Sequence, residues 1–382
     1  MTQGSPLSRS LLFVTGTRAD FGKLEPLAAR AAQDGHRVTF FVTGMHMMEK
    51  YGLTKIEVHR SGQFQVVEYM NQREGDPQDI VLAKTVIGFS DVLQEAPPDL
   101  VLVHGDRIEA LACCLVCATN YIPCAHIEGG EVSGTIDEIF RHCNTKLASA
   151  HLVSSKDARA RVLRLGERAD RVHVIGSPEL DTHAQPTGVT LDQVRARYAI
   201  SAQDYGICVF HPVTSERETI GAQAQALFGA LEASDRYFVV IRPNNDPGAQ
   251  EINRVIDALP PQRFRVLPSM RFLYFSELMR NAAVILGNSS MGVREAPFMG
   301  VPSFDVGTRQ ANRAQAASLI SGSALDGAGI AAFLDSYWGK RFARHTGFGA
   351  GNAAERFADL LRDPGFWDMP LQKHFEDAGT DG

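Results

Sequence analysis

Short apolar runs alternate with longer segments of helical periodicity along the first half of the chain. Runs typical of strands cover Ser10–Val14, Arg37–Val42, Asp99–Val103, Cys124–Ile127 and His151–Ser154. Helical segments between them cover Phe21–Gln33, Asp79–Gln94, Arg107–Thr119 and Phe140–Ser149. Strands that alternate with helices in this way predict a parallel sheet covered by helices on both faces.

The alternation pauses at Thr182–Thr190, where Pro186 and Gly188 interrupt a stretch with little apolar periodicity, and we interpret this stretch as a linker. A second series of strands and helices follows it. The predicted strands are Tyr205–Phe210, Tyr237–Ile241, Phe264–Val266, Val284–Leu286 and Ser303–Val306, with helices that include Gly221–Ala233 and Phe272–Asn281. We therefore predict an α/β protein with two Rossmann-like doubly wound domains, residues 1–185 and 186–350, and a cleft between them.

The composition narrows the class of protein. Apolar residues make up 44% of the 382 residues and charged residues 21%, which is typical of a globular chain. The formal net charge of -6 argues against a general nucleic-acid partner but not against a small anionic ligand. No apolar run has the roughly 18–20 residues that a membrane span needs. The apolar run at Leu11–Val14 is too short for a signal peptide, so we expect a cytoplasmic protein without membrane partners.

The six cysteines do not form the pattern of a disulfide framework or a metal site. Five of them lie between Cys113 and Cys143, and no second pair of Cys or His completes the spacing Cys114-x-x-Cys117. We expect reduced thiols that pack as small apolar groups.

Polar residues directly follow seven of the predicted strands. Because ligands of open α/β sheets bind beyond the carboxyl ends of the strands, these segments predict a shared ligand site. The segments are Thr15–Asp20, His104–Arg107, Glu128–Glu131, His211–Thr214, Arg242–Asp246, Gly287–Ser290 and Gly307–Arg309.

One of these segments has features of an anion site. Ser289 and Ser290 open a helix that we expect to run to about Met299, and free N–H groups at a helix start suit a phosphate. Arg309 and Arg313 are candidates to complete the site, and Gly16–Arg18 is a second anion contact. The alternatives are an ordinary helix cap and solvated arginines.

An acidic set provides candidate chemistry. It consists of Asp106, Glu128, Glu131 and Asp137, joined by His126, His142 and His211. Such groups serve as acid and base when their pKa values are pushed apart, but they also bind Mg²⁺, cap helices or pair with arginines. A P-loop motif is absent, and the sequence at 349–354, a loose match to a dinucleotide-binding motif, follows no predicted strand.

Taken together, these motifs resemble the hydrolysing UDP-N-acetylglucosamine 2-epimerases of sialic acid synthesis. The His126–Glu138 segment is the most specific, because it has Gly-Gly-Glu where the non-hydrolysing branch typically reads HVEAGLRT. The matching segments are Thr15–Gly22, Val42–His46, His104–Arg107, His126–Glu138, Arg141–His142, Gly176–Pro178, His211–Thr214, Pro243–Asp246, Gly287–Ser290 and Gly307–Gln310.

The resemblance implies a glycosyltransferase-B-like fold with the active site between its two domains. It also implies that residues 351–382 contribute a helix, near Asn352–Leu361, that crosses back to the first domain. The implied reaction converts UDP-N-acetylglucosamine and water to N-acetylmannosamine and UDP, without cofactor or metal. The alternatives are the same reaction on UDP-2,4-diacetamido-2,4,6-trideoxyglucose for legionaminic acid, a glycosyltransferase, and a nucleotide-sugar sensor without turnover.

The resemblance also implies roles for particular residues. Asp106, Glu128 and Asp137 are the expected catalytic carboxylates, with Glu131 and His211 as further candidates. The expected contacts to the UDP-sugar are Arg18, Asp20, Asn244, Ser289, Ser290, Glu295, Arg309 and Arg313. Of these, Asn244 and Glu295 are expected near the uridine or its ribose. A homodimer or homotetramer is implied, and Ile80–Leu93 is either its interface helix or a core helix.

Overall fold

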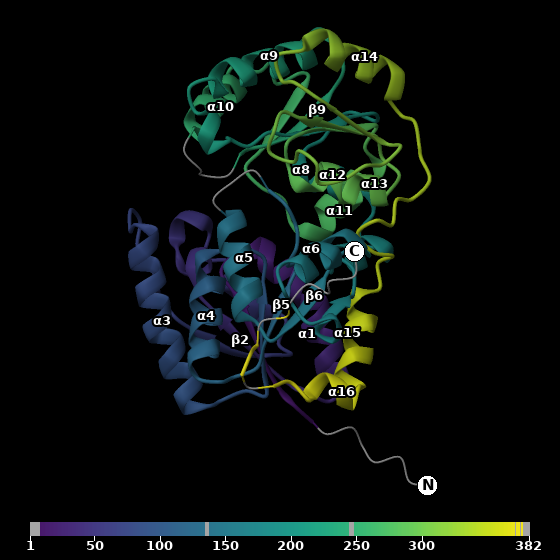
Figure 1. Cartoon of the computed structure of the whole chain (residues 1–382). Helices are drawn as coiled ribbons and strands as arrows, with labels where there is room; N and C mark the ends of the chain where they lie inside the picture. The colour runs from purple at the N-terminus through teal and green to yellow at the C-terminus, as the bar shows by residue number, and fades with distance from the viewer. Residues whose placement is uncertain (1–7, 134–136, 244–247, 371, 375, 377–382) are drawn as a thin grey trace. The chain divides into compact units, whose positions relative to one another are not determined.

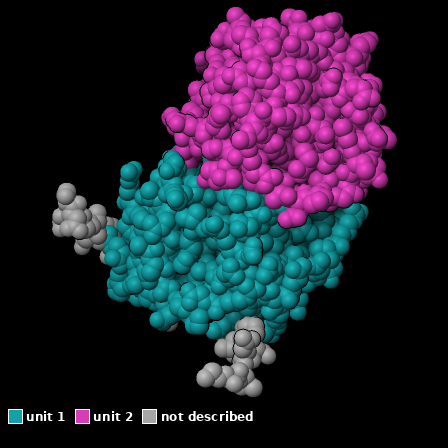
Figure 2. Space-filling view, turned by 90° about the vertical axis from the view of Figure 1, so that its right-hand side faces the viewer, with its two compact units in different colours: residues 1–131, 136–181, 348–382 teal, residues 132–135, 182–347 magenta. Residues whose placement is uncertain are grey.

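The computed structural model describes residues 8–133, 137–243, 248–370, 372–374 and 376. The chain divides into two compact units, which Figure 2 distinguishes by colour. Unit 1 consists of residues 1–131, 136–181 and 348–382, and unit 2 consists of residues 132–135 and 182–347. Each unit has its own parallel sheet and its own apolar core.

The sheet of unit 1 has seven parallel strands in the order β3-β2-β1-β4-β5-β6-β7. Strand β1 pairs with β2 on one side and with β4 on the other, so that Leu11 lies opposite both Val38 and Leu100. The order of the strands reverses between β1 and β4, where ligands bind in doubly wound sheets. The strands are β1 (Ser10–Thr15), β2 (Arg37–Val42), β3 (Gln65–Glu68), β4 (Leu100–His104), β5 (Cys124–Ile127), β6 (Ala150–Val153) and β7 (Val172–Val174).

Helices cover both faces of this sheet (Figure 1). Because successive side chains of a strand point to opposite faces, Leu11 and Phe13 pack with α1 (Arg18–Gln33) and α15 (Ala353–Arg362). Their neighbours Leu12 and Val14 pack on the other face with α3 (Gln78–Glu95) and α4 (Ile108–Thr119). The remaining helices of unit 1 are α2 (Lys55–Arg60), α5 (Asp137–Leu147), α6 (Lys156–Arg164) and α16 (Pro364–Trp367), and α7 (Glu179–Ala184) leads into unit 2.

The sheet of unit 2 has six parallel strands in the order β10-β9-β8-β11-β12-β13, with the reversal between β8 and β11. The strands are β8 (Gly206–Val209), β9 (Phe238–Ile241), β10 (Phe264–Leu267), β11 (Val284–Gly287), β12 (Ser303–Val306) and β13 (Leu319–Gly322). The helices are α8 (Leu191–Tyr198), α9 (Ile220–Ala233), α10 (Ala249–Asp257), α11 (Phe272–Asn281), α12 (Ser290–Val293), α13 (Glu295–Phe298) and α14 (Gly327–Tyr337).

The predicted fold class is confirmed, with two parallel α/β sheets. The expectation of one helix from the Ser289–Ser290 turn to about Met299 is wrong. Two four-residue helices, α12 and α13, replace it and meet at Arg294. The cause is Pro297, which has no N–H to donate to the preceding turn of a continuous helix. Among the described helices, none is both long enough and apolar enough to span a membrane.

Candidate active site

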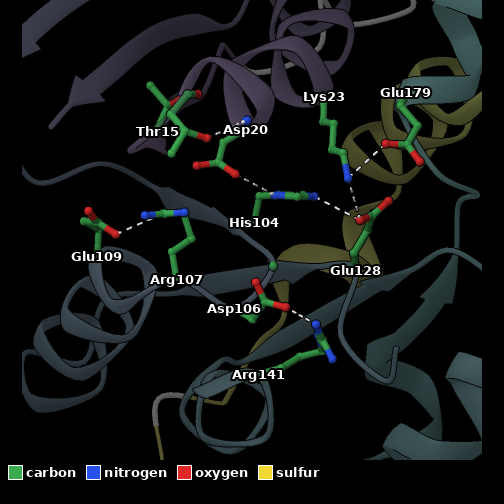
Figure 3. A network of polar contacts seen from close by, with 12 residues as sticks. Thr15, Asp20, Lys23, His104, Asp106, Arg107, Glu109, Glu128, Arg141 and Glu179 are labelled. Atoms are coloured by element: carbon green, nitrogen blue, oxygen red, sulfur yellow. Dashed lines mark hydrogen bonds and ion pairs between the residues drawn. The ribbon is translucent and has the colours of Figure 1, made fainter. Parts of the chain in front are cut away.

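A chain of buried charges lies at the carboxyl edge of the first sheet (Figure 3). It consists of Glu179, Lys23, Glu128, His104 and Asp20, which we call the charge chain. Asp20 and Lys23 come from α1, which follows β1, and His104 ends β4. Glu128 follows β5, and Glu179 begins α7. The parallel sheet brings these residues together, because the carboxyl ends of its strands share one edge.

Positive and negative groups alternate along the charge chain. The Lys23 ammonium lies 2.9 Å from Glu179 Oε2 and 3.4 Å from Glu128 Oε2. His104 Nε2 lies 3.0 Å from the same Glu128 oxygen, and its Nδ1 lies 3.5 Å from Asp20 Oδ1. The last contact is a charge attraction rather than a well-formed hydrogen bond. Buried charges cost several kcal/mol unless they are paired, so each member of the chain depends on its neighbours.

The neighbours of the His104 imidazole favour its charged form. Burial alone lowers the pKa of a histidine, but the Asp20 and Glu128 carboxylates outweigh burial and raise the pKa of His104 above its usual value. Burial likewise opposes the ionised form of Asp20, yet His104, Arg107 and the Thr17 hydroxyl hold the pKa of Asp20 at about 2. The two carboxylates therefore favour the charged form of the imidazole that lies between them.

Glu128 adopts a strained backbone conformation. Its φ of 62° is in the left-handed region, which costs a residue with a side chain about 1–3 kcal/mol. The conformation is fixed by a hydrogen bond from the Glu128 N–H to the Leu152 carbonyl, 2.9 Å long, and by the Ser177 hydroxyl, which donates to Glu128 Oε1. Strain retained at a buried charged residue is characteristic of functional sites.

The next two residues explain why the segment continues with two glycines. At Gly130, whose φ is 75°, a Cβ atom would lie 2.2 Å from the Ala158 carbonyl oxygen. At Gly129 it would lie 2.9 Å from His126 Nδ1. The Gly-Gly pair therefore lets the strand end approach α6 and the ring of His126.

Asp106 lies beside the charge chain and is paired with a buried arginine. Arg141 Nη2 donates to Asp106 Oδ2, and its Nη1 donates to the Glu131 carbonyl over 3.0 Å. The Glu131 carboxylate is buried and accepts a hydrogen bond from the Ser154 hydroxyl. Arg141 thus ties two of the candidate carboxylate residues to α5, and the Asp106 side chain remains 26% exposed.

His126 has a supporting role. Its Nε2 lies 2.7 Å from the carbonyl oxygen of Gly105, the residue before Asp106, and Asn144 Nδ2 donates to the same carbonyl over 3.1 Å. Burial lowers the pKa of His126 to about 3, so the ring is neutral and donates from Nε2. Two donors thereby fix the turn that carries Asp106. His142, the other histidine of this segment, is 44% exposed and lies 3.6 Å from Glu138.

Arg107 connects Asp137 to the same edge. Asp137 is the first residue of α5. Burial opposes the charged form of Arg107, but Glu109, Asp20 and Asp137 outweigh it and raise the pKa of Arg107. Glu109 Oε2 lies 3.4 Å from Arg107 Nε, and a Cβ atom at Gly44 would lie 2.6 Å from Glu109 Oε1. The glycine therefore leaves room for the carboxylate that partners Arg107.

In unit 2, a reciprocal pair of hydrogen bonds links the ends of β8 and β11. Asn288 Oδ1 accepts from the backbone N–H of His211 over 2.7 Å, and Asn288 Nδ2 donates to the His211 carbonyl over 2.8 Å. Arg309 Nη1 and Gln310 Nε2 each donate to the Asn288 carbonyl over 3.1 Å. Three candidate segments of the sequence, which follow β8, β11 and β12, are thus connected beside the reversal of the second sheet.

The other candidate residues of unit 2 surround these loops. Ser289 precedes α12 and Ser290 begins it, and Arg313 Nη1 donates to Gln310 Oε1 over 2.8 Å. Glu295 is buried, and its Oε1 lies 2.8 Å from Nε2 of the fully buried His183. His183 Nδ1 lies 2.8 Å from the Ser276 hydroxyl, so Glu295 is fixed through His183.

Arg18 and Asn244 are two further candidates for contacts to the UDP-sugar. Arg18 of unit 1 pairs with Glu57 across 2.9 Å, and both side chains are about one third exposed. Asn244 lies outside the described residues.

The part of the chain that the structure describes contains no group of three or more His, Cys, Asp or Glu residues arranged to hold a metal ion. All six cysteines are free, and burial raises the pKa of the Cys113, Cys117 and Cys208 thiols. Thiols held in their neutral form pack as apolar groups and are poor metal ligands.

Sequence reasoning missed several residues of these clusters. Lys23 and Glu179 act on Glu128, and His183 holds Glu295. His104 and Ser177, which also contact Glu128, lay in segments that the sequence singled out but were given no role. The spacing of Asp20 and Lys23, three residues apart, is a signal that both lie on one face of a helix. Glu179 and His183 have no such local signal, because their partners are distant in the sequence.

Comparisons with known proteins identify the family. Residues 29–362 match the family model described as UDP-N-acetylglucosamine 2-epimerase. The chain belongs to the UDP-N-acetylglucosamine 2-epimerase family.

Three curated relatives cover most of the chain. A UDP-N-acetylglucosamine 2-epimerase of Neisseria meningitidis serogroup B is 40% identical over 97% of this chain and 99% of its own. A UDP-N,N'-diacetylbacillosamine 2-epimerase (hydrolyzing) of Legionella pneumophila is 31% identical over 93% of this chain and 96% of its own. The polysialic acid biosynthesis protein P7 of Escherichia coli is 29% identical over 82% of each chain.

Solved structures share the fold. A UDP-GlcNAc 2-epimerase from Neisseria meningitidis bound to UDP-GlcNAc superposes with a TM-score of 0.79 at 20% identity, covering 92% of this chain and 99% of that one. The enzyme from Methanocaldococcus jannaschii, in complex with UDP-GlcNAc and UDP, gives a TM-score of 0.78 at 20% identity and the same coverage. These matches confirm the predicted glycosyltransferase-B-like architecture.

The second unit also contains a carboxyl group inside a strand, Asp305 in β12. Its side chain is buried, and Oδ1 has no hydrogen-bond partner among the described residues. Burial raises the pKa of Asp305 to about 6, although Arg309 and Arg313 partly oppose this shift. A pKa above the unfolded value means that the folded protein binds this proton more tightly, so stability falls as the pH rises through about 6.

We therefore expect Asp305→Asn to stabilise the protein at pH 8 by roughly 2–3 kcal/mol and to have little effect at pH 4. The measurement is the Tm of the variant and of the unaltered protein at both pH values. Asp335→Asn, at a largely exposed position of α14, is the matched control and should change neither Tm. An equal shift of Tm at pH 4 and pH 8 would contradict the prediction.

Proposed function

We propose that this protein is a hydrolysing UDP-N-acetylglucosamine 2-epimerase, which converts UDP-N-acetylglucosamine and water to N-acetylmannosamine and UDP as the first step toward sialic acid. One observation carries the proposal. In a chain that belongs to this family, Glu128 and Asp106 lie at one sheet edge, and each is paired with a cation. The family membership alone does not distinguish hydrolysis from simple epimerisation.

The chemistry requires carboxylates and an anion site. The C2 proton of the sugar is weakly acidic because no carbonyl group lies next to it. The bond between C1 and the UDP oxygen breaks, UDP leaves with the electron pair, and a base removes the C2 proton to give a glycal. Water then adds its oxygen to C1, and a proton returns to C2 from the opposite face. Electrons balance without a redox cofactor or a metal, and each proton transfer needs a positioned acid or base.

Asp106, Glu128 and Asp137 are the groups to which we assign these proton transfers, with Glu131 and His211 as further candidates. Asp106 is paired with Arg141, and Glu128 with His104, in a mostly buried setting. Low dielectric surroundings strengthen the interaction of such charges with a developing positive centre at C1. Glu131 accepts from Ser154 and carries the carbonyl that Arg141 binds, which suits a supporting role.

The UDP moiety is assigned to groups that stabilise anions or bind hydroxyls. Ser289, Ser290, Arg309, Arg313 and Arg18 are the candidates for the diphosphate, because hydroxyls and guanidinium groups donate to phosphate oxygens. Glu295, held by His183, is the candidate for the ribose, since a carboxylate accepts hydrogen bonds from hydroxyls. Asn244 and Asp20 complete the proposed set.

Two features support the hydrolysing branch and its pathway. The His126–Glu138 segment has the Gly-Gly-Glu sequence rather than the sequence typical of the non-hydrolysing branch. The Legionella relative, 31% identical, is named as hydrolyzing, and the Escherichia coli relative is named for polysialic acid biosynthesis.

A second candidate function is the same reaction on UDP-2,4-diacetamido-2,4,6-trideoxyglucose, toward legionaminic acid. It is favoured by the similarity to the Legionella enzyme, which is named for UDP-N,N'-diacetylbacillosamine. The two sugars differ at C4 and C6, so the ratio of their kcat/KM values, measured side by side, decides between them.

Proton NMR in heavy water tests the proposed reaction directly. Incubation with UDP-N-acetylglucosamine, without added metal or NAD, should release UDP and N-acetylmannosamine with one deuterium at C2. Accumulation of UDP-N-acetylmannosamine would exclude hydrolysis, and a product without deuterium at C2 would exclude the elimination route. Transfer of the sugar to an added acceptor, with C2 unchanged, would identify a glycosyltransferase instead.

The carboxylate variants Asp106→Asn and Glu128→Gln test the assigned roles. Since positioned acids and bases contribute about 10²–10⁴-fold to rate, we expect kcat to fall by at least about 100-fold in each variant. The Kd for UDP, measured by calorimetry, should change less than about threefold. Asp170→Asn, an exposed carboxylate of unit 1, is the control and should leave kcat unchanged. A large loss of UDP affinity with little change in kcat would reassign the residue to nucleotide binding.

We also infer a homodimer or homotetramer that uses α3 and α4. Ile80 and Ile87 lie on one face of α3, and Leu115 of α4 and the adjacent Tyr121 are also exposed. Light scattering should give a mass of at least twice 41.7 kDa, and Ile87→Glu should lower it. Leu325→Glu, at an equally exposed leucine of unit 2, should not. A monomeric unaltered protein would contradict the inference.

A further inference from the structure

We propose that Glu179 is a positioning residue for the reaction: it shares Lys23 with Glu128, offsets part of the Lys23 charge and thereby sets the pH range in which the Glu128 carboxylate is active. This inference rests on the proposed function and adds a residue to it. No motif singled out Glu179, and it lies on α7 rather than at the end of a strand.

The geometry makes Lys23 a bridge between two carboxylates. Its ammonium lies closer to Glu179 Oε2, at 2.9 Å, than to Glu128 Oε2, at 3.4 Å. The Lys23 side chain is 19% exposed, whereas those of Glu128 and Glu179 are 5% and 3% exposed. The stronger contact is therefore with the carboxylate that does not carry an assigned proton transfer. A lysine side chain has about 2 kcal/mol of rotamer entropy, so a second partner is needed to keep it in one position.

The segment that carries Glu179 is itself fixed to the Glu128 carboxylate. The Ser177 hydroxyl donates to Glu128 Oε1, while Lys23 and His104 contact Oε2. The backbone N–H of Ser177 donates to the Phe348 carbonyl over 2.7 Å. Two residues of one short segment, Ser177 and Glu179, thus act on the same carboxylate, one directly and one through Lys23.

The charged and titratable groups around Glu128 come from every element packed against it. Lys23 comes from α1, His104 from β4, and His126 from β5, and Glu179 and Asp20 act through Lys23 and His104. His126 is neutral, because burial lowers its pKa to about 3. Lys23, and His104 in its charged form, therefore favour the ionised form of Glu128, and Glu179 offsets part of the Lys23 charge.

Removal of either partner of the Glu179–Lys23 pair should shift the pH dependence in opposite directions. In Glu179→Gln the amide oxygen still accepts from Lys23 and keeps it in place, while the full charge of Lys23 acts on Glu128. The acid limb of the kcat/KM profile should therefore move to lower pH by about half a unit. In Lys23→Gln the stabilising cation is lost, so the acid limb should move to higher pH by about one unit or more. A role in folding alone would lower the amount of active enzyme without moving either limb.

The experiment is the pH profile of kcat/KM for UDP-N-acetylglucosamine with the full chain. Lys23→Arg keeps the charge and should keep the acid limb of the unaltered protein, which separates charge from packing. Glu167→Gln is the matched control: Glu167 is equally buried and is paired with Lys146, His151 and Lys373, but it lies outside the charge chain. Its profile should not shift.

The outcomes distinguish this inference from the proposed function. If the unaltered protein does not convert the substrate, the proposed function fails. If it does, and the acid limbs of Glu179→Gln and Lys23→Gln stay in place or move in the same direction, Glu179 does not offset the charge of Lys23 at Glu128 and the inference fails. Opposite shifts of the two limbs, with Lys23→Arg and Glu167→Gln unmoved, support the inference.

Discussion

The central strands of both sheets are buried on both faces, and this constraint determines where polar side chains can lie. All five residues of β4 are buried, as are all four residues of β5, β6, β8 and β11. Apolar side chains above and below these strands meet helices, so most polar groups lie where a strand ends, and exceptions such as His126 and Asp305 are buried within strands. The polar and charged side chains of each unit therefore gather at the carboxyl edge of its sheet, and the loops at those edges have few alternative positions.

The two units solve the problem of buried polar groups differently. Unit 1 concentrates full charges, and each member of the charge chain is stabilised by an opposite charge on at least one side. Unit 2 relies mainly on hydrogen bonds to backbone groups, with the Asn288 amide connecting the ends of β8 and β11. Charges of fixed position favour proton transfer, whereas backbone donors and hydroxyls favour the binding of an anionic group. This difference is consistent with separate tasks for the two units.

The fold could be predicted from the sequence because its pattern of apolar runs is strong and local. Strands β2, β5 and β12 have the expected bounds, but β3, β7 and β13 are short edge or near-edge strands with weak apolar patterns and were missed. The break at Arg294 was also missed, although Pro297 gives a local signal for it.

The candidate site was predictable only in part. The residues that follow strand ends, such as Asp106 and Glu128, have a positional signal, and their catalytic roles stay predictions. Their partners do not have such a signal: Lys23 is 105 residues from Glu128 in the sequence, and His183 is 112 residues from Glu295. Such pairs arise from packing. The neutral state of His126 also arises from packing: its position in a motif suggested acid or base chemistry, but burial lowers its pKa to about 3.

The position of α15 has a consequence for how the protein is made. Phe357 and Leu361 of this helix fill the face of the first sheet that carries Leu11 and Phe13, so the core of unit 1 combines the beginning and the end of the chain. During synthesis the ribosome releases residues 182–347, nearly all of unit 2, before it releases α15. The unit whose strands emerge first is therefore completed after the other one, and its apolar face stays uncovered in the nascent chain until residues 353–362 have been released.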